Sequence, residues 1–173
     1  MISRVSARTK EVAMIWKKVT KVAATAGAAE GGTELNAFDN ALLAAGIGNV
    51  NLLKVSSIVP PDVDVVELPA IKPGVLVPTA YAAITSETPG QTIAAAVGYA
   101  LPEDRTKAGV IMEYHDRVDG ETADRAVRAM LAEAFVVRGE RIREVRVVTA
   151  EHRVRKIGCA VAAVALLSED DLL

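Results

Sequence analysis

The 173-residue chain is poor in cysteine, histidine and aromatic residues, and each shortage limits what the protein can do. Its one cysteine, Cys159, cannot form an internal disulfide, and the apolar residues around it predict a buried thiol without a catalytic role. Two histidines and scattered acids are too few for a metal site, so we predict that no metal is bound. Because aromatic residues make up only 3%, the core must consist mainly of small and β-branched side chains, which suits closely packed sheets.

The chain also lacks a strong charge of either sign and any long apolar run. Its formal net charge of −2 argues against a dedicated nucleic-acid binder. No segment approaches the roughly 18 apolar residues that cross a bilayer. Residues 1–16 carry charges throughout and lack the apolar stretch of a secretory signal. We therefore expect a cytoplasmic protein that binds neither membrane nor nucleic acid.

Hydrophobic residues make up 51% of the chain and charged residues 24%, which predicts a folded protein. We expect residues 1–17 to form an N-terminal extension and residues 18–173 to form one domain. Two helices are expected at residues 36–45, with Asn36 as the cap, and at 122–138, which Gly139 ends. Strands are expected at residues 19–26, 51–55, 75–86, 92–101, 108–114, 145–152 and 157–167, although the alanines of 92–101 also allow a helix. This order predicts an α+β fold.

The most informative pattern begins at Asn49, where an extended run stops at two adjacent serines, Ser56 and Ser57, before a Pro60-Pro61 corner. A Ser-Ser pair at a strained strand end can cleave its own backbone. The Ser57 hydroxyl attacks the Ser56 carbonyl, and the resulting ester releases Ser56 as a carboxylate by β-elimination. Residue 57 becomes dehydroalanine and hydrolyses to a pyruvoyl group. Most Ser-Ser pairs are ordinary turn residues, so the surrounding sequence must decide.

That sequence closely resembles pyruvoyl-dependent arginine decarboxylases, in segments that occur in order along most of the chain. The longest is ELNAFDNALLAAGIGNVNL at residues 34–52, followed by SSIVPP at 56–61. Further matching segments are LVPTAY at 76–81, GVIMEY at 109–114, EH at 151–152 and KIGCA at 156–160. Each segment alone would be weak, but their combination is highly specific.

The resemblance implies a self-processing proenzyme with a four-layer αββα sandwich fold. Cleavage between Ser56 and Ser57 would give a β chain of residues 1–56 and an α chain of residues 57–173. The α chain would begin with the covalent pyruvoyl cofactor. This lyase would convert L-arginine to agmatine and CO2 through a Schiff base, as a step of polyamine biosynthesis. The resemblance also implies a homotrimer, or a dimer of trimers, with active sites between neighbouring protomers.

Two residues would serve the chemistry. Glu113 is the candidate proton donor, because strand alternation turns its side chain away from Met112 and Tyr114, and an apolar site would keep a carboxyl protonated. A solvated glutamate at a strand end is the alternative. Asn51, on an inward strand face, would hold the Ser56 carbonyl during self-cleavage. Its alternative is an edge asparagine that bonds the backbone.

Four further residues would form the substrate site. The Asp39 carboxylate would bind the guanidinium of arginine through two parallel hydrogen bonds. The alternative is an ordinary exposed helix acid. Gly46, Gly48 and Val50 would shape the pocket through close approach of the backbone. His152 is expected to be structural.

Other functions stay open. The chain could be an unprocessed paralogue that acts as a structural subunit or binds a small molecule, or it could decarboxylate another basic amino acid. A paralogue of that kind would be expected to have lost Ser57, Asn51 or Glu113, and all three are present. An enzyme with Ser57 as a simple nucleophile would need a general base beside it, and the sequence offers no such pattern.

Overall fold

The computed structural model describes residues 17–173. The predicted N-terminal extension therefore lies outside the described residues except for Lys17, and its separation from the domain stays a prediction. The elements, in chain order, are β1 (Lys21–Glu30), α1 (Glu34–Ala44), β2 (Asn51–Lys54), β3 (Ile58–Val59), β4 (Asp64–Val65), β5 (Leu76–Ser86), β6 (Thr92–Pro102), β7 (Gly109–Asp116), α2 (Gly120–Arg138), β8 (Ile142–Arg153), β9 (Gly158–Leu167) and the single 3-10 turn η1 (Glu169–Asp171).

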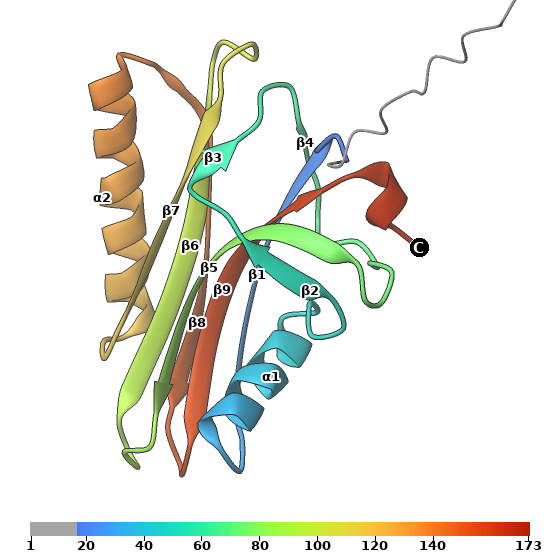
Figure 1. The fold of residues 1–173 in the computed structure, drawn as a ribbon. Helices are drawn as coiled ribbons and strands as arrows, with labels where there is room; N and C mark the ends of the chain where they lie inside the picture. Colours follow the sequence, from blue (N-terminus) through green and yellow to red (C-terminus); the bar gives the residue numbers. More distant parts are fainter. Residues whose placement is uncertain (1–16) are drawn as a thin grey trace, which may run out of the picture.

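The strands form two sheets that pack face to face (Figure 1). One sheet has five strands in the order β2-β5-β9-β1-β4, and the other has four in the order β3-β7-β6-β8. Helix α1 covers the outer face of the five-stranded sheet, and α2 covers the outer face of the four-stranded sheet (Figure 1). The predicted α+β class is confirmed, and these layers are compatible with an αββα sandwich.

Small side chains in β6 and β9 explain how four layers pack so closely. In β6, Ala94 and Ala96 pack beneath α2, while the alternate residues Val97 and Tyr99 face the other sheet. All ten residues of β9 are buried, as predicted for a strand covered on both faces. The β6 segment is a strand, which excludes the helix that its alanines allowed.

The start of α1 differs from the prediction. Thr33, not Asn36, is the N-cap: its backbone is extended, and its hydroxyl accepts a hydrogen bond from the Asn36 N–H at 3.2 Å. The helix therefore begins two residues earlier, at Glu34. Its predicted end is confirmed, because Gly46 adopts a left-handed backbone with φ of 79°. The strands β3 and β4 were not predicted, since two-residue strands carry no periodicity.

Candidate active site

Ser56 and Ser57 lie where the chain crosses from one sheet to the other. Residue 54 ends β2, the edge strand of the five-stranded sheet, and residue 58 begins β3, the edge strand of the four-stranded sheet. On the side of the five-stranded sheet, the Val55 N–H donates to the Thr79 carbonyl at 3.2 Å. On the side of the four-stranded sheet, the Ile111 N–H donates to the Ser57 carbonyl at 2.9 Å. The two serines are therefore fixed from opposite ends by different sheets.

A tight three-residue turn joins the two ends. The Ile58 N–H donates a hydrogen bond of 3.0 Å to the carbonyl oxygen of Ser56, which is the carbonyl that Ser57 would attack. Neither serine has a positive φ; within residues 17–173 only Asp62 does so among non-glycine residues. The strain expected at this strand end therefore does not take the form of a left-handed backbone conformation. Ser56 is exposed and Ser57 is half-buried.

Glu113 stands on β7 beside this turn. It lies two residues beyond Ile111, so both side chains project from the same face, toward the five-stranded sheet. Met112 and Tyr114 pack against α2 on the opposite face, which confirms the predicted alternation. The apolar site expected around Glu113 is not present in residues 17–173: the side chain is 32% exposed, and its Oε1 lies 3.4 Å from Lys54 Nζ.

Lys54 is the site residue that sequence reasoning missed. Its ammonium donates to the Tyr81 carbonyl at 3.1 Å and lies 4.6 Å from the centroid of the Tyr81 ring. Phe38 of α1 supports that ring at a centroid distance of 6.4 Å. A cation held by an aromatic face, a carbonyl and a carboxylate is fixed in place. The only signal in the sequence was a basic residue two positions before the serine pair.

The predicted substrate residues form a second group. Asp39 is exposed on α1, away from the face that buries Ala37 and Ala41 against the sheet, and it forms no ion pair with any residue of 17–173. Asn51 shares the inner face of β2 with Val55, as predicted, but is exposed. Its side-chain amide donates to the Gly74 carbonyl at 2.9 Å.

The glycines of this group are required by their surroundings. A Cβ on Gly48 would lie 2.7 Å from the side chain of Leu43 and 2.8 Å from its nitrogen, so only glycine allows the chain to pass the end of α1 so closely. Gly46 needs its left-handed backbone to turn the chain. Val50 then packs with Leu68 on the outer side of the sheet. Close backbone approach is present at Gly48, and the pocket-shaping role of Gly46, Gly48 and Val50 stays a prediction.

Within residues 17–173 no hydrogen bond or ion pair joins the two groups directly, although Lys54 connects Glu113 to the Tyr81 ring, which packs on Phe38 of α1. Helix α1 carries Asp39 on the outer side of the five-stranded sheet, whereas Ser57 and Glu113 lie at the crossover between the sheets. Ser56 lies five positions after Asn51, or about 16 Å along an extended chain. In the described part of one protomer, the catalytic and substrate-binding candidates are therefore not hydrogen-bonded to one another.

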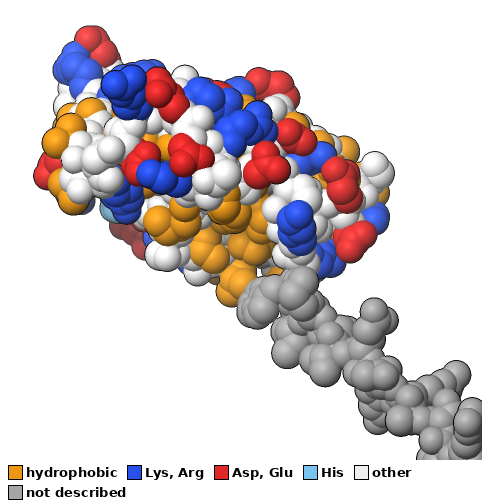
Figure 2. Space-filling view, turned by 90° about the horizontal axis from the view of Figure 1, so that it is seen from above, with side chains coloured by type: hydrophobic (Ala, Val, Ile, Leu, Met, Phe, Trp, Pro, Cys, Tyr) orange, Lys and Arg blue, Asp and Glu red, His pale blue; other side chains and the backbone are white. Residues whose placement is uncertain are grey.

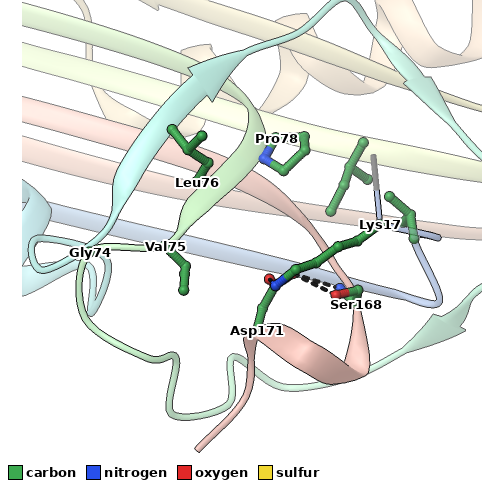
Figure 3. A pocket seen from close by; sticks show the side chains of 9 residues that line it. Lys17, Gly74, Val75, Leu76, Pro78, Ser168 and Asp171 are labelled. Carbon is green, nitrogen blue, oxygen red and sulfur yellow. Dashed lines mark hydrogen bonds and ion pairs between the residues drawn. The ribbon is translucent and has the colours of Figure 1, made fainter. Parts of the chain in front are cut away.

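A cavity of about 360 Å³ lies next to Asn51, where β5 begins (Figure 3). Its lining includes Gly74, Leu76 and Pro78, and neither Ser57 nor Glu113 borders it. The carboxylate of Asp171 points into this region but is already neutralised by Lys17 Nζ at 2.8 Å (Figure 3). The cavity therefore offers an apolar wall without a free carboxylate for a cationic substrate.

The remaining polar candidates are His152, His115 and Cys159. His152 Nε2 lies 2.6 Å from Glu30 Oε1 and ties the end of β8 to the end of β1, in agreement with its predicted role. His115 is exposed. Cys159 is fully buried, and this burial raises the pKa of its thiol to about 11. Across residues 17–173 we find no group of three or more side chains suited to hold a metal.

The visible surface in Figure 2 carries both charge signs around one gathering of hydrophobic side chains, beside the start of the described chain. Large exposed apolar residues include Ile58 at the crossover edge, Leu76 opposite Asn51 at the start of β5, and Leu35 and Leu43 on α1. None of the helices in residues 17–173 has the length and apolar character to span a membrane. The cytoplasmic location stays a prediction.

Comparison with known proteins gives a consistent result. Residues 21–171 match the family model for pyruvoyl-dependent arginine decarboxylase. A protein with that name from Methanocaldococcus jannaschii is 48% identical over 151 residues, which cover 87% of this chain and 92% of the relative. The protein of that name from Pyrococcus abyssi is 49% identical over 156 residues, which cover 88% of this chain and 98% of the relative. The protein of that name from Methanococcus vannielii is 40% identical over 159 residues, which cover 92% of this chain and 97% of the relative.

Proposed function

Because this chain belongs to the pyruvoyl-dependent arginine decarboxylase family, we propose that it converts L-arginine to agmatine and CO2 with a pyruvoyl group made from its own residue 57. The observation that carries this proposal is the Ser56-Ser57 crossover beside Glu113. Ser57 stands next to the carbonyl it must attack, in a turn fixed by two backbone hydrogen bonds. Glu113 projects toward the same edge from the adjacent strand.

The surroundings of residue 57 fit a chain end that carries a pyruvoyl group. After cleavage, Ile58 and Val59 would stay paired with β7, and the Ile111 N–H would continue to hold the carbonyl of residue 57. Ser56 would stay at the end of β2 in the other sheet. The group supplies a keto carbonyl that condenses with the substrate amine and withdraws electrons from the α-carbon as CO2 leaves. Residues of β3 and β7 would hold and orient it.

Glu113 would deliver the proton that the α-carbon needs after CO2 has left. Its position on the inner face of β7 supports this role, because the carboxyl projects toward the edge that holds residue 57. Lys54 would fix the direction of the Glu113 side chain, since its Nζ lies 3.4 Å from Oε1, and the carboxyl would take up a proton before each transfer. The side chain is only 32% exposed, so substrate binding could enclose it further.

Asp39 would bind the guanidinium end of arginine, as a carboxylate free of any ion pair within residues 17–173. Gly46, Gly48 and Val50 would shape the wall beside it. Asn51 would assist self-cleavage across a subunit boundary, because in its own chain the amide is bound to Gly74 and remote from Ser56. These roles match the positions in the segments that resemble the family.

The active form would be a homotrimer, alone or as a dimer of trimers, with each active site between two protomers. Two observations support this arrangement. Within one chain the Asp39 carboxylate and the Ser57–Glu113 group share no hydrogen bond or ion pair in residues 17–173, so a neighbour would complete the site. Large apolar side chains, 44% exposed at Ile58 beside the crossover and 63% exposed at Leu76 beside Asn51, also stand where a second copy would cover them.

Intact mass under denaturing conditions is the first test. We expect two fragments, one ending at Ser56 and one beginning at residue 57 with a blocked N-terminus. Ser57→Ala should instead remain a single chain of 18.2 kDa. A wild-type chain that stays uncut after long incubation would contradict the proposal and favour a binding or structural subunit. Product analysis with arginine, lysine and ornithine would then identify the substrate of the cleaved protein.

Glu113→Gln separates catalysis from cleavage. We expect decarboxylation per pyruvoyl group to fall by about 10²–10⁴-fold, as for loss of a general acid.

The shared site has its own test, in which Glu113→Gln and Asp39→Asn protomers are mixed after unfolding and refolded together. Mixed assemblies should regain activity that neither variant has alone. Mixtures as inactive as the parents would contradict a site between protomers.

A further inference from the structure

The scissile carbonyl already has a hydrogen-bond donor in the uncleaved chain. The oxygen of Ser56 accepts from the backbone N–H of Ile58 at 3.0 Å. The strand register explains why this N–H is free to do so. Because the Ile111 N–H bonds the Ser57 carbonyl, Ser57 and Ile111 form a hydrogen-bonded pair, and the next pair, Ile58 with Val110, is a non-hydrogen-bonded one. The Ile58 N–H therefore points away from β7, toward Ser56.

We propose that the backbone N–H of Ile58 is the donor that stabilises the oxyanion formed on Ser56 during self-cleavage. This inference rests on the proposed function, since it concerns the first step of pyruvoyl formation. In that step, a bond forms between the Ser57 hydroxyl oxygen and the Ser56 carbonyl carbon, and the carbonyl oxygen becomes negatively charged. The bond from that carbon to the Ser57 nitrogen then breaks. The hydroxyl proton passes to the nitrogen, and an ester remains.

A donor in this position favours the transition state over the starting amide. The hydrogen bond becomes charge-assisted as negative charge grows on the Ser56 oxygen, and charge-assisted bonds are about twice as strong as neutral ones. No rearrangement is needed, because the N–H already lies 3.0 Å from the oxygen that will carry the charge. Loss of one such donor typically costs about 10²–10³-fold in rate.

Ile58 is suited to this role through its backbone alone. Its side chain is 44% exposed, so position 58 tolerates side-chain changes that leave the turn intact. Asn51, the other candidate donor, offers its amide to Gly74 in the same chain. The two assignments differ in what they require: Asn51 acts only in an assembly, whereas the Ile58 N–H acts within each protomer.

The test removes the N–H in two independent ways. Ile58→Pro deletes it at an edge strand, where proline is tolerated. Replacement of residue 58 by the hydroxy acid that corresponds to isoleucine deletes it without fixing φ. Ile58→Val keeps the N–H and serves as the matched control. The measurement is the rate of cleavage between residues 56 and 57 by intact mass, with circular dichroism to verify folding.

We expect wild type and Ile58→Val to cleave at equal rates. Both variants without the N–H should cleave at least about 100-fold more slowly. Hydroxylamine, which cuts esters, should release fragments from Ile58→Pro far more slowly than from wild type, since ester formation is the step that is slowed. Fragments released from Ile58→Pro at the wild-type rate, or a hydroxy-acid variant that cleaves at the wild-type rate, would overturn the inference. If Ile58→Pro does not fold, the hydroxy-acid variant decides. An uncut wild type would instead overturn the proposed function, and this inference with it.

Discussion

Replacing Glu30 with glutamine should reduce the acid sensitivity of this fold. The Glu30 carboxylate stands at the end of β1 and accepts three hydrogen bonds from the β8–β9 connection. The donors are the Arg155 N–H at 2.9 Å, the Lys156 N–H at 2.8 Å and His152 Nε2 at 2.6 Å. This carboxylate therefore links two parts of the chain, the end of β1 and residues 152–156, that the sequence separates by more than 120 residues.

The pKa of Glu30 gives the magnitude. Burial raises this pKa, but the hydrogen bonds from Arg155, His152 and Lys156 outweigh it and lower the pKa from 4.5 to about 2. At about 1.4 kcal/mol for each tenfold change in proton affinity, the ionised carboxylate adds about 3 kcal/mol of stability at neutral pH. Since the pKa in the folded state is depressed, this stability is present above pH 4.5 and is lost as the pH falls toward about 2.

Urea unfolding at fixed protein concentration between pH 7 and pH 3 tests this expectation. The free energy of unfolding of wild type should exceed that of Glu30→Gln at pH 7, and the gap should narrow by about 2 kcal/mol at pH 3. The exposed Glu87 provides the control, because Glu87→Gln should follow wild type at every pH. A gap for Glu30→Gln that stays constant across this range would refute the linkage between its ionisation and folding.

Three further predictions follow from contacts of single side chains. Gly27→Ala should lower the free energy of unfolding by about 1–3 kcal/mol or more, because the new Cβ would lie 2.4 Å from the Ala45 nitrogen. Gly32→Ala, with no atom within 4 Å of its Cβ, should be close to neutral in the same urea assay, and equal losses would contradict the clash. The Cys159 thiol should resist a thiol reagent at pH 8 in the native protein and react only in denaturant, since burial raises its pKa to about 11; fast native labelling would contradict this. Lys54→Met should lower decarboxylation per cleaved chain about 10–100-fold by releasing the Glu113 carboxylate, and Lys54→Arg should restore most of it. An unchanged rate in Lys54→Met would exclude a positioning role.

The sequence predicted the long strands and helices because their burial is periodic. The α2 stripe, with buried Ala123, Val127 and Leu131, and the doubly buried β9 could be recognised without knowledge of the fold. The N-cap of α1 could not, because Thr33 and Asn36 are both good capping residues. The choice depends on which of them has an extended backbone. The strands β3 and β4 exist only through pairing with distant partners, which no local pattern reveals.

The same limit applies to the site. Ser57 and Glu113 could be proposed from segments that resemble a family, but their proximity depends on β3 pairing with β7 at Ile58 and Val110. Lys54 was overlooked because a lysine on an edge strand is usually a solvated charge. Its contacts with Tyr81 and Glu113 come from different sheets. Chemistry that arises where two sheets meet therefore requires the tertiary structure.

The position of the Ser56-Ser57 bond also explains how the protein could be cut without coming apart. The β chain would contain β1, α1 and β2, and β1 is an inner strand paired with β9 over its whole length, from Lys21 to Glu30. On the other side of the cut, β3 would stay paired with β7. Cleavage would therefore break a connection between two edges while leaving both sheets and the core between them paired. A break inside β1 or β9 would remove central ladder hydrogen bonds, whereas the crossover is a place where a new chain end can form beside Glu113 and both fragments stay bound.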